Sequence, residues 1–490
     1  MIDWSREERY KPIEEVSKEE LNELENVVKK CPFRQGYHIQ PITGLLNDPN
    51  GFSFYNGEYH LFYQWFPRGP VHGLKYWYHT SSKDLVNWKE HGIGINPGDW
   101  FDSHGAFSGS GIVHDNKLHL LYTGNTRDEN WVRTPYQCLA IMDDKNIVKK
   151  HSEPVVNGVP EGYTDHFRDP KVFKKGNEFY AVIGAQNTDL KGRIVYYKSK
   201  DLINWEFVNE VNTSLNDFGF MWECPDYIEL DGKGILIFSP QGLEKNGDKY
   251  ANIYQSGYMV GEPIDLTSGK FNHGEFIELD NGFDFYAPQT TEDLNERRIL
   301  VGWMGLPEIE YPTDKNGWAH CLTLPRELTL INNKLIQKPV KELEELRENH
   351  RYIESIINGE ERSFDRFEGE RYELICTFKD FSEGKVGVKL RVSEDEETVA
   401  YYDVDNKKFT LDRSKSGEIF ATEWGTTRST SLDCKELSLQ IFVDSSSVEI
   451  FINGGEKVFT SRIFPDKNST GIRFLSTEKC NIKAHMWSIK

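Results

Sequence analysis

The most constraining feature of the sequence is a unit of about 60 residues that recurs five times between His38 and Pro339. Each unit consists of a short motif, a β-strand, a tight turn and a second strand, and Asn56-Gly57 is the clearest of the turns. The turn centres fall near residues 57, 116, 176, 232 and 295. Five all-β units of similar length predict a radial array, and we therefore expect a five-bladed β-propeller.

A second element repeats with the same period. The run SKDLVNW at residues 82–88 returns as SKDLINW at residues 199–205, two periods further along the chain. The agreement of two long runs at this offset supports the division of the chain into equal units.

Three carboxylic acids stand just ahead of the first strand of their units. Asp48, Asp169 and Glu223 precede the hairpin glycines of the first, third and fourth units by 9, 7 and 9 residues. The first strand of every blade lines the central channel of a propeller, so we expect the three acids to occupy equivalent positions and to converge on one axial pocket. Crowded like charges raise the proton affinity of at least one acid, an arrangement that suits acid/base chemistry.

The regions outside the repeat predict three further parts. Residues 17–30 are expected to form an amphipathic helix, because Ser17 and Glu20 make a capping box. Its expected apolar face consists of Leu21, Leu24, Val27 and Val28. The chain as a whole is expected to be all-β, with a short helical extension at residues 1–37, the propeller at 38–339, a linking helix at 340–351 and a β-sandwich of alternating strands at 352–490.

Charge and cysteine content exclude several classes of function. The chain has 58 Lys and Arg against 78 Asp and Glu, a net charge of −20, and no basic run, so neither nucleic acid nor membrane is an expected partner. Seven scattered cysteines without a CxxC pair argue against a disulfide framework or structural zinc. No stretch reaches 18 apolar residues and the start of the chain is charged, so we expect a soluble, cytoplasmic protein. Its oligomeric state stays open.

Four histidines lie within 33 residues, but their spacings match no metal-ligand pattern: His72, His79, His91 and His104. We therefore expect no metal and no other cofactor.

The motifs together resemble glycoside hydrolase family 32. The resemblance rests on LNDPNG (46–51), FSGS (107–110), FRDP (167–170) and WECP (222–225) in this order, and on the turn VDSSSVEIF (443–451) in the C-terminal part. The runs WSREERY (4–10) and GPVHGLK (69–75) look most like bacterial members that hydrolyse sucrose-6-phosphate. One departure is Leu45-Leu46, where the family often has an aromatic residue and Met. Both choices supply apolar packing, so the same reaction is expected.

This resemblance implies roles for individual residues. Asp48 would be the nucleophile of a β-fructofuranosidase, Glu223 the general acid and base, and Asp169 the residue that holds fructose hydroxyls and stabilises the transition state. Arg168 would neutralise part of the local negative charge. The fructose subsite would be lined by Asn47, Gln64, Phe107, Ser108, Tyr286 and Trp303. Retention of configuration follows if the two catalytic carboxyls are about 5–5.5 Å apart, and inversion if they are roughly 6.5–9.5 Å apart.

Several alternatives remain open at this point. Hydrolysis of plain sucrose, of fructans such as levan or inulin, and an inverting arabinan-type reaction are rival activities, and a non-catalytic sugar-binding propeller is a rival class. A phosphate on the sugar would need positive charge at the mouth of the pocket. The candidates for that charge are His72, Lys75, Arg127 and Arg133.

Overall fold

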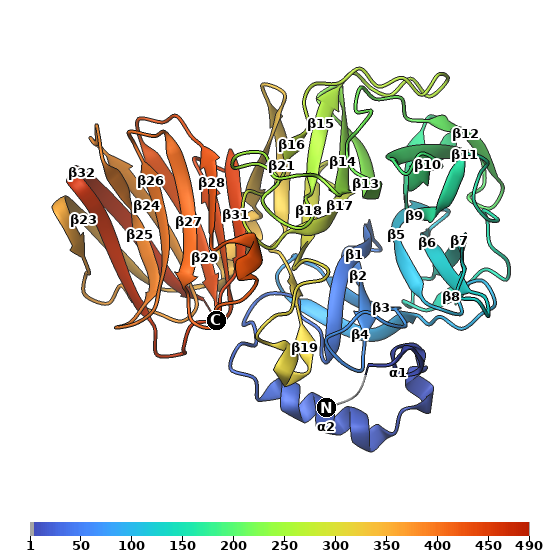
Figure 1. Cartoon of the computed structure of the whole chain (residues 1–490), viewed down its shortest axis with the longest axis horizontal. Coiled ribbons are helices and arrows are strands. Elements are labelled where there is room, and N and C mark those ends of the chain that lie inside the picture. The colour runs from blue at the N-terminus through green and yellow to red at the C-terminus, as the bar shows by residue number, and fades with distance from the viewer. Residues whose placement is uncertain (1–3, 490) are drawn as a thin grey trace.

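Five β-sheets, each built on four main strands, surround a central axis and form the propeller, as the repeat predicted (Figure 1). The computed structural model describes residues 4–489. Blade 1 contains β1 (Gly44–Tyr55), β2 (Glu58–Phe66), β3 (Tyr76–Ser82) and β4 (Trp88–Ile95). Blade 2 contains β5 (Ala106–His114), β6 (Lys117–Arg127), β7 (Arg133–Met142) and β8 (Val148–Lys150). Blade 3 contains β9 (Tyr163–Lys175), β10 (Glu178–Asn187), β11 (Gly192–Ser199) and β12 (Trp205–Glu210).

The last two blades complete the ring. Blade 4 contains β13 (Met221–Leu230), β14 (Lys233–Gln241), β15 (Gly257–Gly261) and β16 (Ile277–Glu278), and blade 5 contains β17 (Tyr286–Glu292), β18 (Arg298–Met304), β21 (Arg326–Ile331) and β22 (Lys334–Pro339). β20 (Cys321–Leu322) adds to β18, and β19 (Trp318–Ala319) pairs in parallel with the start of β1. The β19 pairing ties the blade 5 segment to blade 1 and closes the ring.

The repeated SKDL run folds into the same turn in blades 1 and 3. The Oδ1 atom of Asp84 accepts hydrogen bonds from the backbone N–H groups of Val86 and Asn87 at 2.9 and 2.7 Å. The Oδ1 atom of Asp201 accepts the equivalent bonds at 3.0 and 2.8 Å. Two copies of one local structure, two blades apart, are what the sequence offset predicted.

The N-terminal extension lies along blade 1 (Figure 1). It contains α1 (Arg6–Tyr10), the 3₁₀ helix η1 (Ile13–Glu15) and α2 (Lys18–Lys29), which Ser17 caps by accepting a hydrogen bond from the N–H of Glu20 at 3.1 Å. Of the expected apolar face, Val28 is buried but Val27 is 49% exposed, so the apolar stripe is narrower than the sequence pattern suggested. Arg68 of blade 1 holds the extension by binding the backbone oxygen and carboxylate of Glu8 at 2.6 and 2.7 Å.

The segment between the propeller and the C-terminal part differs from the expected helix at 340–351. It is a short 3₁₀ helix, η3 (Lys341–Leu346), followed directly by the strand β23 (Arg347–Arg362). Lys and Glu alternate with Leu in this segment, but Leu343 is its one buried residue in the structure, which gives too little apolar area to support a longer α-helix.

The C-terminal part is one continuous sheet folded onto itself into two layers. Its strands are β24 (Tyr372–Lys379), β25 (Lys385–Val392), β26 (Glu397–Asp403), β27 (Lys408–Lys415), β28 (Thr427–Ser431), β29 (Leu437–Asp444), β30 (Ser447–Ile452), β31 (Lys457–Arg462) and β32 (Gly471–Ile489). The first part of β32 pairs with β25 and its second part with β24, so this long strand joins the layers. The expected sandwich is therefore present, with its core between the two halves of one sheet.

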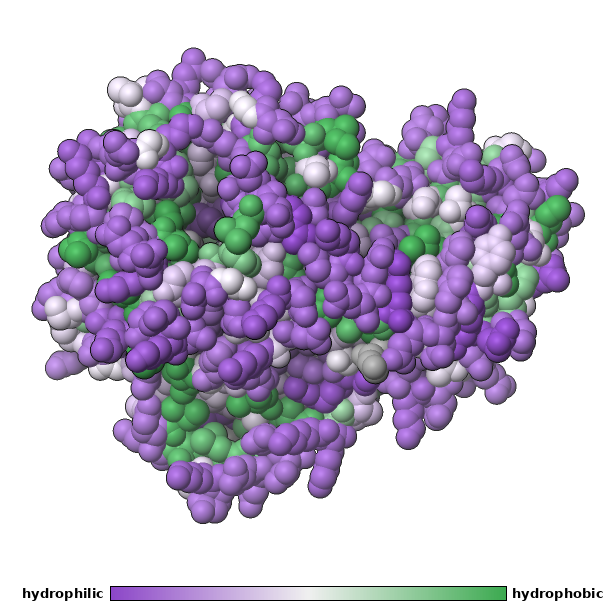
Figure 2. Space-filling view, turned by 180° about the vertical axis from the view of Figure 1, so that it is seen from behind, coloured by the Kyte–Doolittle hydropathy of each residue, from purple (hydrophilic) through white to green (hydrophobic). Residues whose placement is uncertain are grey.

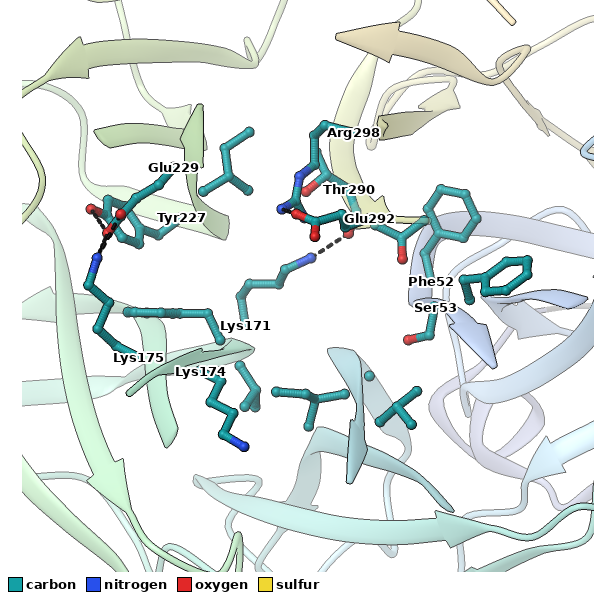
Figure 3. Close-up of a pocket in the computed structure, with 18 residues that line it drawn as sticks. Phe52, Ser53, Lys171, Lys174, Lys175, Tyr227, Glu229, Thr290, Glu292 and Arg298 are labelled. Carbon is teal, nitrogen blue, oxygen red and sulfur yellow. Dashed lines mark hydrogen bonds and ion pairs between the residues drawn. The ribbon is translucent and has the colours of Figure 1, made fainter. Parts of the chain in front are cut away.

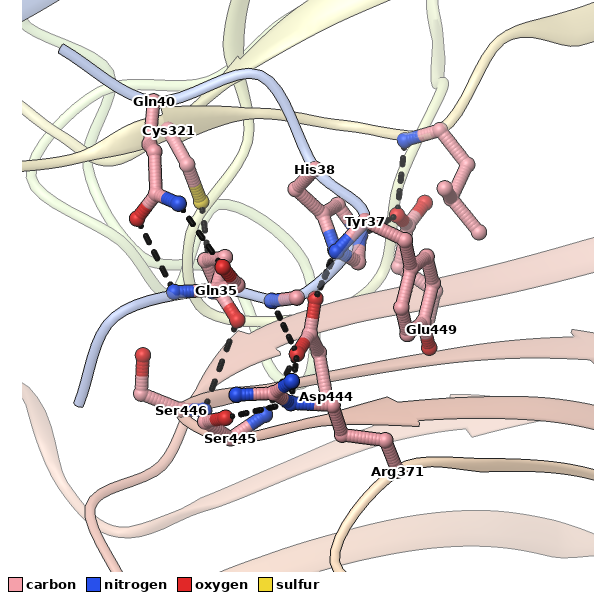
Figure 4. A network of polar contacts seen from close by, with 12 residues as sticks. Gln35, Tyr37, His38, Gln40, Cys321, Arg371, Asp444, Ser445, Ser446 and Glu449 are labelled. Atoms are coloured by element: carbon pink, nitrogen blue, oxygen red, sulfur yellow. Dashed lines mark hydrogen bonds and ion pairs between the residues drawn. The ribbon is translucent and has the colours of Figure 1, made fainter. Parts of the chain in front are cut away.

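Buried charges join the two parts of the molecule (Figure 4). His38, just ahead of the first blade, contacts Asp444 at 2.8 Å through Nδ1 and Glu449 at 3.1 Å through Nε2. Arg326 of blade 5 contacts the other oxygen of Glu449 at 2.7 Å and Asp280 at 3.1 Å. The motif at residues 443–451 thus anchors the sandwich to the propeller.

The outer surface is mainly hydrophilic on the face in Figure 2, in keeping with the net charge of −20.

Candidate active site

Each innermost strand of the propeller carries a β-bulge where its motif lies. In blades 3, 4 and 5 two residues face a single residue of the neighbouring strand, and these pairs are Asp169-Pro170, Cys224-Pro225 and Ala287-Pro288. The first residue of each pair has a positive φ, of 68°, 48° and 47°. A bulge bends its strand and re-aims the side chains around it. Side chains from different blades meet at this level of the channel.

The bulges correct one expectation about the three acids. Asp48 and Asp169 directly precede a proline, whereas Glu223 lies one residue earlier and Cys224 takes the position before Pro225. Glu223 is therefore equivalent to Asn47 and Arg168. The three acids still converge, but they come from two adjacent positions of the repeat.

Asp48 is held by donors from blades 1 and 2. Its Oδ2 atom accepts a 2.5 Å hydrogen bond from the hydroxyl of Ser108, and its Oδ1 atom accepts one from Asn47 at 3.2 Å. The thiol of Cys224 lies 3.6 Å from Oδ2 of Asp48 and 3.6 Å from Oδ2 of Asp169. The sulfur atom of Cys224 thus contacts both aspartates and limits how closely their carboxyl groups approach.

Glu223 accepts hydrogen bonds on both of its carboxylate oxygens. Arg168 donates to Oε1 through Nε and NH2, at 2.9 and 2.6 Å. Tyr286 donates its hydroxyl to Oε2 at 2.6 Å, and Gln241 donates its amide to the same oxygen at 2.8 Å. These donors come from blades 3, 5 and 4, so the orientation of Glu223 depends on three separate blades.

A chain of polar side chains leads away from Asp48 inside the pocket. Lys75 donates to Asn47 at 2.7 Å, Asn47 donates to Gln64 at 2.6 Å, and Gln64 donates to Ser108 at 2.7 Å. Ser108 then donates to Asp48, and all four members of the chain are buried. Each hydroxyl and amide of the chain is therefore fixed in one hydrogen-bonding direction.

Burial dominates the charge states of the two aspartates. It raises the pKa of Asp169 to about 7, with Arg168 opposing this and the charges of Glu223 and Asp48 adding to it. Burial also raises the pKa of Asp48, partly offset by the hydrogen bond from Ser108. For Arg168 burial alone would lower the pKa, but Glu223 and Asp169 outweigh it, so the guanidinium stays charged. When ionised, the acids of the site therefore carry more negative charge than the single guanidinium of Arg168 balances.

The remaining expected subsite residues lie close by but differ in surroundings. Trp303 is 2% exposed and packs edge-on against Tyr286 and His72, with ring centroids 6.0 and 6.2 Å apart. Phe107 precedes the bulge of blade 2 and is partly buried, and its backbone oxygen accepts a hydrogen bond from Trp77. The Phe107 ring takes no part in the hydrogen-bond network of the three acids, although it lies at the same level of the channel.

Several residues of the site were not foreseen from the sequence. Gln241 binds Glu223 from β14, and Thr123 accepts the N–H of Asp169 at 3.0 Å from β6. His166 contacts Arg168 at 3.1 Å. Cys224 stands inside a recognised motif, so its position beside the acids could have been anticipated, whereas Gln241 and Thr123 carry no sequence signal.

The four candidates for phosphate binding fall into two groups. Lys75 is buried and bonded to Asn47, and burial lowers its pKa to about 7 against the opposing effect of Asp48. His72 is exposed at the mouth beside Trp303. Arg127 and Arg133 are partly buried, and the Nε atoms of both are buried without a hydrogen-bond partner.

The cluster of histidines in blade 1 is structural. His79 stacks on His91 with ring centroids 4.4 Å apart and contacts His60 at 3.0 Å, inside the blade. Within residues 4–489, no group of three or more His, Cys, Asp or Glu side chains has an arrangement that could hold a metal ion. None of the helices in that range has the length and apolar character that crossing a membrane requires.

Three carboxyls around one axial pocket, with an arginine and ordered amides and hydroxyls beside them, define a glycoside hydrolase built on a five-bladed propeller. The chain belongs to glycosyl hydrolases family 32. The model of the family's N-terminal domain matches residues 38–339, and the model of its C-terminal domain matches residues 342–488.

Several sucrose-6-phosphate hydrolases are similar to this chain over almost its whole length. A sucrose-6-phosphate hydrolase of Staphylococcus xylosus is 48% identical over 478 residues, which is 98% of this chain and 96% of the relative. The sucrose-6-phosphate hydrolase of Bacillus subtilis (strain 168) is 43% identical, over 96% of this chain and 97% of the relative. The solved structure of the sucrose-6-phosphate hydrolase of Lactobacillus gasseri has a TM-score of 0.93 and 38% identity, over 100% of this chain and 99% of that one.

Proposed function

We propose that the protein hydrolyses sucrose-6-phosphate to glucose-6-phosphate and fructose as a retaining β-fructofuranosidase. The observation that carries this proposal is the pairing, in one pocket, of an aspartate fixed by Ser108 with a glutamate that three blades orient. The names of relatives up to 48% identical support the phosphorylated substrate.

In the first step, Asp48 attacks C2 of the fructosyl unit while the bond from C2 to the bridging oxygen breaks. Glu223 gives its proton to that oxygen, and glucose-6-phosphate leaves. The product of this step is a covalent fructosyl-enzyme. The Ser108 and Asn47 hydrogen bonds hold both oxygens of Asp48, so the nucleophile does not rotate during the attack.

In the second step, Glu223 takes a proton from a water molecule, whose oxygen attacks C2. The C2–Asp48 bond breaks, fructose leaves, and Glu223 is protonated again. Asp169 stabilises the positive charge that develops on the fructosyl ring, and its neighbour Arg168 offsets part of the negative charge of the acids. Two successive inversions give net retention.

The phosphate is proposed to bind to Arg127 and Arg133. Neither forms an ion pair with an acid among the described residues, and burial followed by the charges of Arg168 and Arg127 lowers the pKa of Arg133 to about 10 against the smaller opposing effect of Asp165. Two cations in a partly buried site repel each other, and a bound anion stabilises them by offsetting this repulsion. Lys75 is a weaker candidate, because its ammonium is already bonded to Asn47.

The N-terminal extension supports this arginine pair. Trp131 lies between Arg6 of α1, whose guanidinium is 4.0 Å from the ring centroid, and Arg127 at 5.5 Å. Tyr10 packs edge-on against the same ring at 5.1 Å. Residues of the WSREERY run (4–10) therefore pack against the loop of blade 2 that would bind the phosphate.

The catalytic roles are tested by changing the leaving group. Asp48→Ala should abolish hydrolysis of every fructoside, whereas Glu223→Ala should keep activity on a fructoside whose leaving group needs no protonation. Glu206→Ala, which removes an exposed acid on an outer strand, is the control and should behave like the parent enzyme. Equal losses of Glu223→Ala activity for all leaving groups would contradict its role as general acid.

The substrate is tested by the ratio of kcat/KM for sucrose-6-phosphate to that for sucrose. Arg133→Gln and Arg127→Gln should each raise KM for sucrose-6-phosphate about tenfold, the scale of one charge-assisted contact, and barely change hydrolysis of sucrose. Arg366→Gln, which removes an exposed arginine of the C-terminal part, is the matched control. A parent enzyme that favours sucrose or a fructan would overturn the phosphorylated substrate while leaving the fructosidase reaction intact.

A further inference from the structure

Three polar side chains and the proposed nucleophile close a ring of hydrogen bonds in the active site. Asn47 donates to Oδ1 of Asp48 and to Oε1 of Gln64, at 3.2 and 2.6 Å. Gln64 donates to the hydroxyl of Ser108 at 2.7 Å, and Ser108 donates to Oδ2 of Asp48. In this direction of the ring, both carboxylate oxygens of Asp48 accept a hydrogen bond, which stabilises the charged form of the nucleophile.

The same side chains can also form the ring in the opposite direction. An amide and a hydroxyl each carry a donor and an acceptor, so turning over the amides of Asn47 and Gln64 preserves the bonds between them and Ser108. Gln64 would then donate to Asn47, and the single hydroxyl hydrogen of Ser108 would go to Gln64. Asp48 would lose both of these donors, and its Oδ1 atom would face the amide oxygen of Asn47.

Lys75 contacts the ring from outside with a fixed polarity. Its ammonium donates to Oδ1 of Asn47 at 2.7 Å, and an ammonium group has three donors and no acceptor. The turned-over amide of Asn47 would aim its own N–H groups at this ammonium, which is unfavourable because two donors would meet. Lys75 therefore selects the direction of the ring in which both oxygens of Asp48 accept hydrogen bonds.

The surroundings of Lys75 argue against a role in packing alone. The residue directly precedes β3 and is only 3% exposed, and its backbone oxygen accepts the N–H of Ala106 at 2.9 Å. Burying an ammonium group against an amide costs free energy, and a Met side chain would fill similar space without this cost. The charge at this position therefore needs a reason, and the contact with Asn47 supplies one.

We propose that Lys75 is a positioning residue, which fixes the hydrogen-bond direction of the ring through Asn47 and so keeps two donors on Asp48. The inference rests on the proposed function, because it assigns Lys75 to the nucleophile of that reaction. A lysine that bound the phosphate would act on KM for the phosphorylated substrate, whereas a lysine that orients the nucleophile acts on every fructoside.

The charges around the ring give the sign of its pH dependence. Burial raises the pKa of Asp48, and the hydrogen bonds from Ser108 and Asn47 and the charge of Lys75 lower it. Other titratable groups act on Asp48 or Lys75 from the surrounding elements, namely Glu223, Asp169, Cys224, His72 and His320. Removing Lys75 takes away one charge and, through the ring, two hydrogen bonds that favour the ionised nucleophile. The acid limb of kcat/KM should then move to higher pH.

The test compares Lys75→Met with the parent enzyme on sucrose and on sucrose-6-phosphate. On both substrates kcat/KM should fall about tenfold or more, the scale of lost charge-assisted hydrogen bonds, and the acid limb should rise by about one pH unit. Lys75→Gln should lose less activity than Lys75→Met, because its amide can still donate to Asn47. Lys83→Met, which removes an exposed lysine of blade 1, is the matched control and should behave like the parent.

A double-mutant cycle with Asn47→Ala shows whether Lys75 acts through Asn47. In the Asn47→Ala background, Lys75→Met should change kcat/KM by less than about twofold, because the contact that it removes is already absent. Equal losses in both backgrounds would overturn the proposal, as would a Lys75→Met enzyme that hydrolyses sucrose like the parent. A loss confined to KM for sucrose-6-phosphate would make Lys75 a phosphate ligand instead.

Urea unfolding of the same four proteins measures the coupling of the two side chains without any substrate. The destabilisation of the double variant should differ clearly from the sum of the two single changes, since the side chains are in contact. Additive effects would contradict the proposed contact. Clear coupling in a parent protein that hydrolyses neither fructoside would refute the proposed function but leave the directed ring in place.

Discussion

Replacing His38 by Gln should loosen the attachment of the sandwich to the propeller. The His38 side chain is 1% exposed and lies between two fully buried carboxylates, Asp444 at 2.8 Å and Glu449 at 3.1 Å (Figure 4). Arg326 also contacts Glu449, but within residues 4–489 Asp444 has only Arg371, at 3.4 Å, as a second cation. Without the imidazolium, one buried carboxylate loses its main counter-charge, and such a loss typically costs about 3–5 kcal/mol.

The pKa of His38 gives a second measure of the same interaction. Burial alone would lower this pKa, but the hydrogen bonds to Asp444 and Glu449 outweigh burial and raise it to about 9. Compared with an ordinary value near 6.5, this corresponds to about 3 kcal/mol of stabilisation of the folded protein. The two figures describe one interaction and are not added.

The sign of the pH dependence follows from the raised pKa. The stabilisation is fully present below pH 6.5, where His38 is protonated in both folded and unfolded chains, and it is lost as the pH rises through about 9. The destabilisation caused by His38→Gln should therefore be about 3 kcal/mol at pH 6 and close to zero at pH 10.

The assay is urea unfolding at several pH values, followed by tryptophan fluorescence, with the first transition taken as the separation of the two parts. His350→Gln, which removes an exposed histidine of the C-terminal part, is the control and should show no such trend. A penalty for His38→Gln below about 1 kcal/mol at pH 6, or one that does not shrink between pH 6 and pH 10, would refute this account of the interface.

Three further predictions concern single side chains. The pKa of Asp169 is raised to about 7, so ionising this buried carboxyl destabilises the folded protein. The destabilisation is absent below the ordinary pKa near 3.8 and grows as the pH rises to 7. Asp169→Asn should therefore stabilise the protein at pH 8 by up to about 4 kcal/mol in thermal unfolding, and it should abolish activity. Tyr286→Phe removes one charge-assisted hydrogen bond to Glu223 and should lower kcat/KM about tenfold, and a loss below about twofold would mean that Tyr286 does not orient Glu223. Asp84→Ala and Asp201→Ala should each cost about 1 kcal/mol in urea unfolding, and clearly unequal costs would show that the two turns are not energetically alike.

The number of blades could be predicted from the sequence because the signal is a period. Each unit repeats the same strand and turn pattern, and the SKDL turn adds a long identical run in blades 1 and 3. A repeated local pattern of this kind predicts the global architecture even when no long-range contact is known. The capping of α2 by Ser17 could be predicted for a similar reason, since the cap and its partner are three residues apart.

The equivalence of the acids could not be predicted by counting back from the turns. Gly176 is the first residue of its turn, whereas Gly57 and Gly232 are the second residues of theirs. Strand β1 also has a second bulge between Asn50 and Ser53, which adds one residue to the count in blade 1 only. The second bulge made Glu223 match the count of Asp48 although Glu223 lies one position earlier in the repeat, and the early glycine of its turn shortened the count of Asp169.

Partners that reach the site from the second strand of a blade also escaped prediction. Gln241 and Thr123 contact Glu223 and Asp169, but they belong to β14 and β6, where period-two alternation fixes only which side of the strand a residue occupies. Whether such a residue meets an acid depends on the bulge in the strand beside it. Sequence motifs therefore mark the innermost strands, and the residues that orient the acids become visible only once the register of each hairpin is known.

The two-for-one bulges also explain how one propeller can hold different chemistry at its two ends. At each bulge the strand bends, and beyond it the chain continues with a different set of side chains facing the axis. In blade 3 this change takes place within three residues, from Asp169 at the pocket of the acids to Lys171, which lines a cavity of about 540 Å³ at the opposite end of the channel (Figure 3). Lys171 pairs with Asp226, which follows Glu223 by three residues, as Lys171 follows Arg168. The pocket of the acids and the cavity that Lys171 lines are therefore formed by consecutive stretches of the same strands, and the four motif prolines between them leave a space of only about 10 Å³.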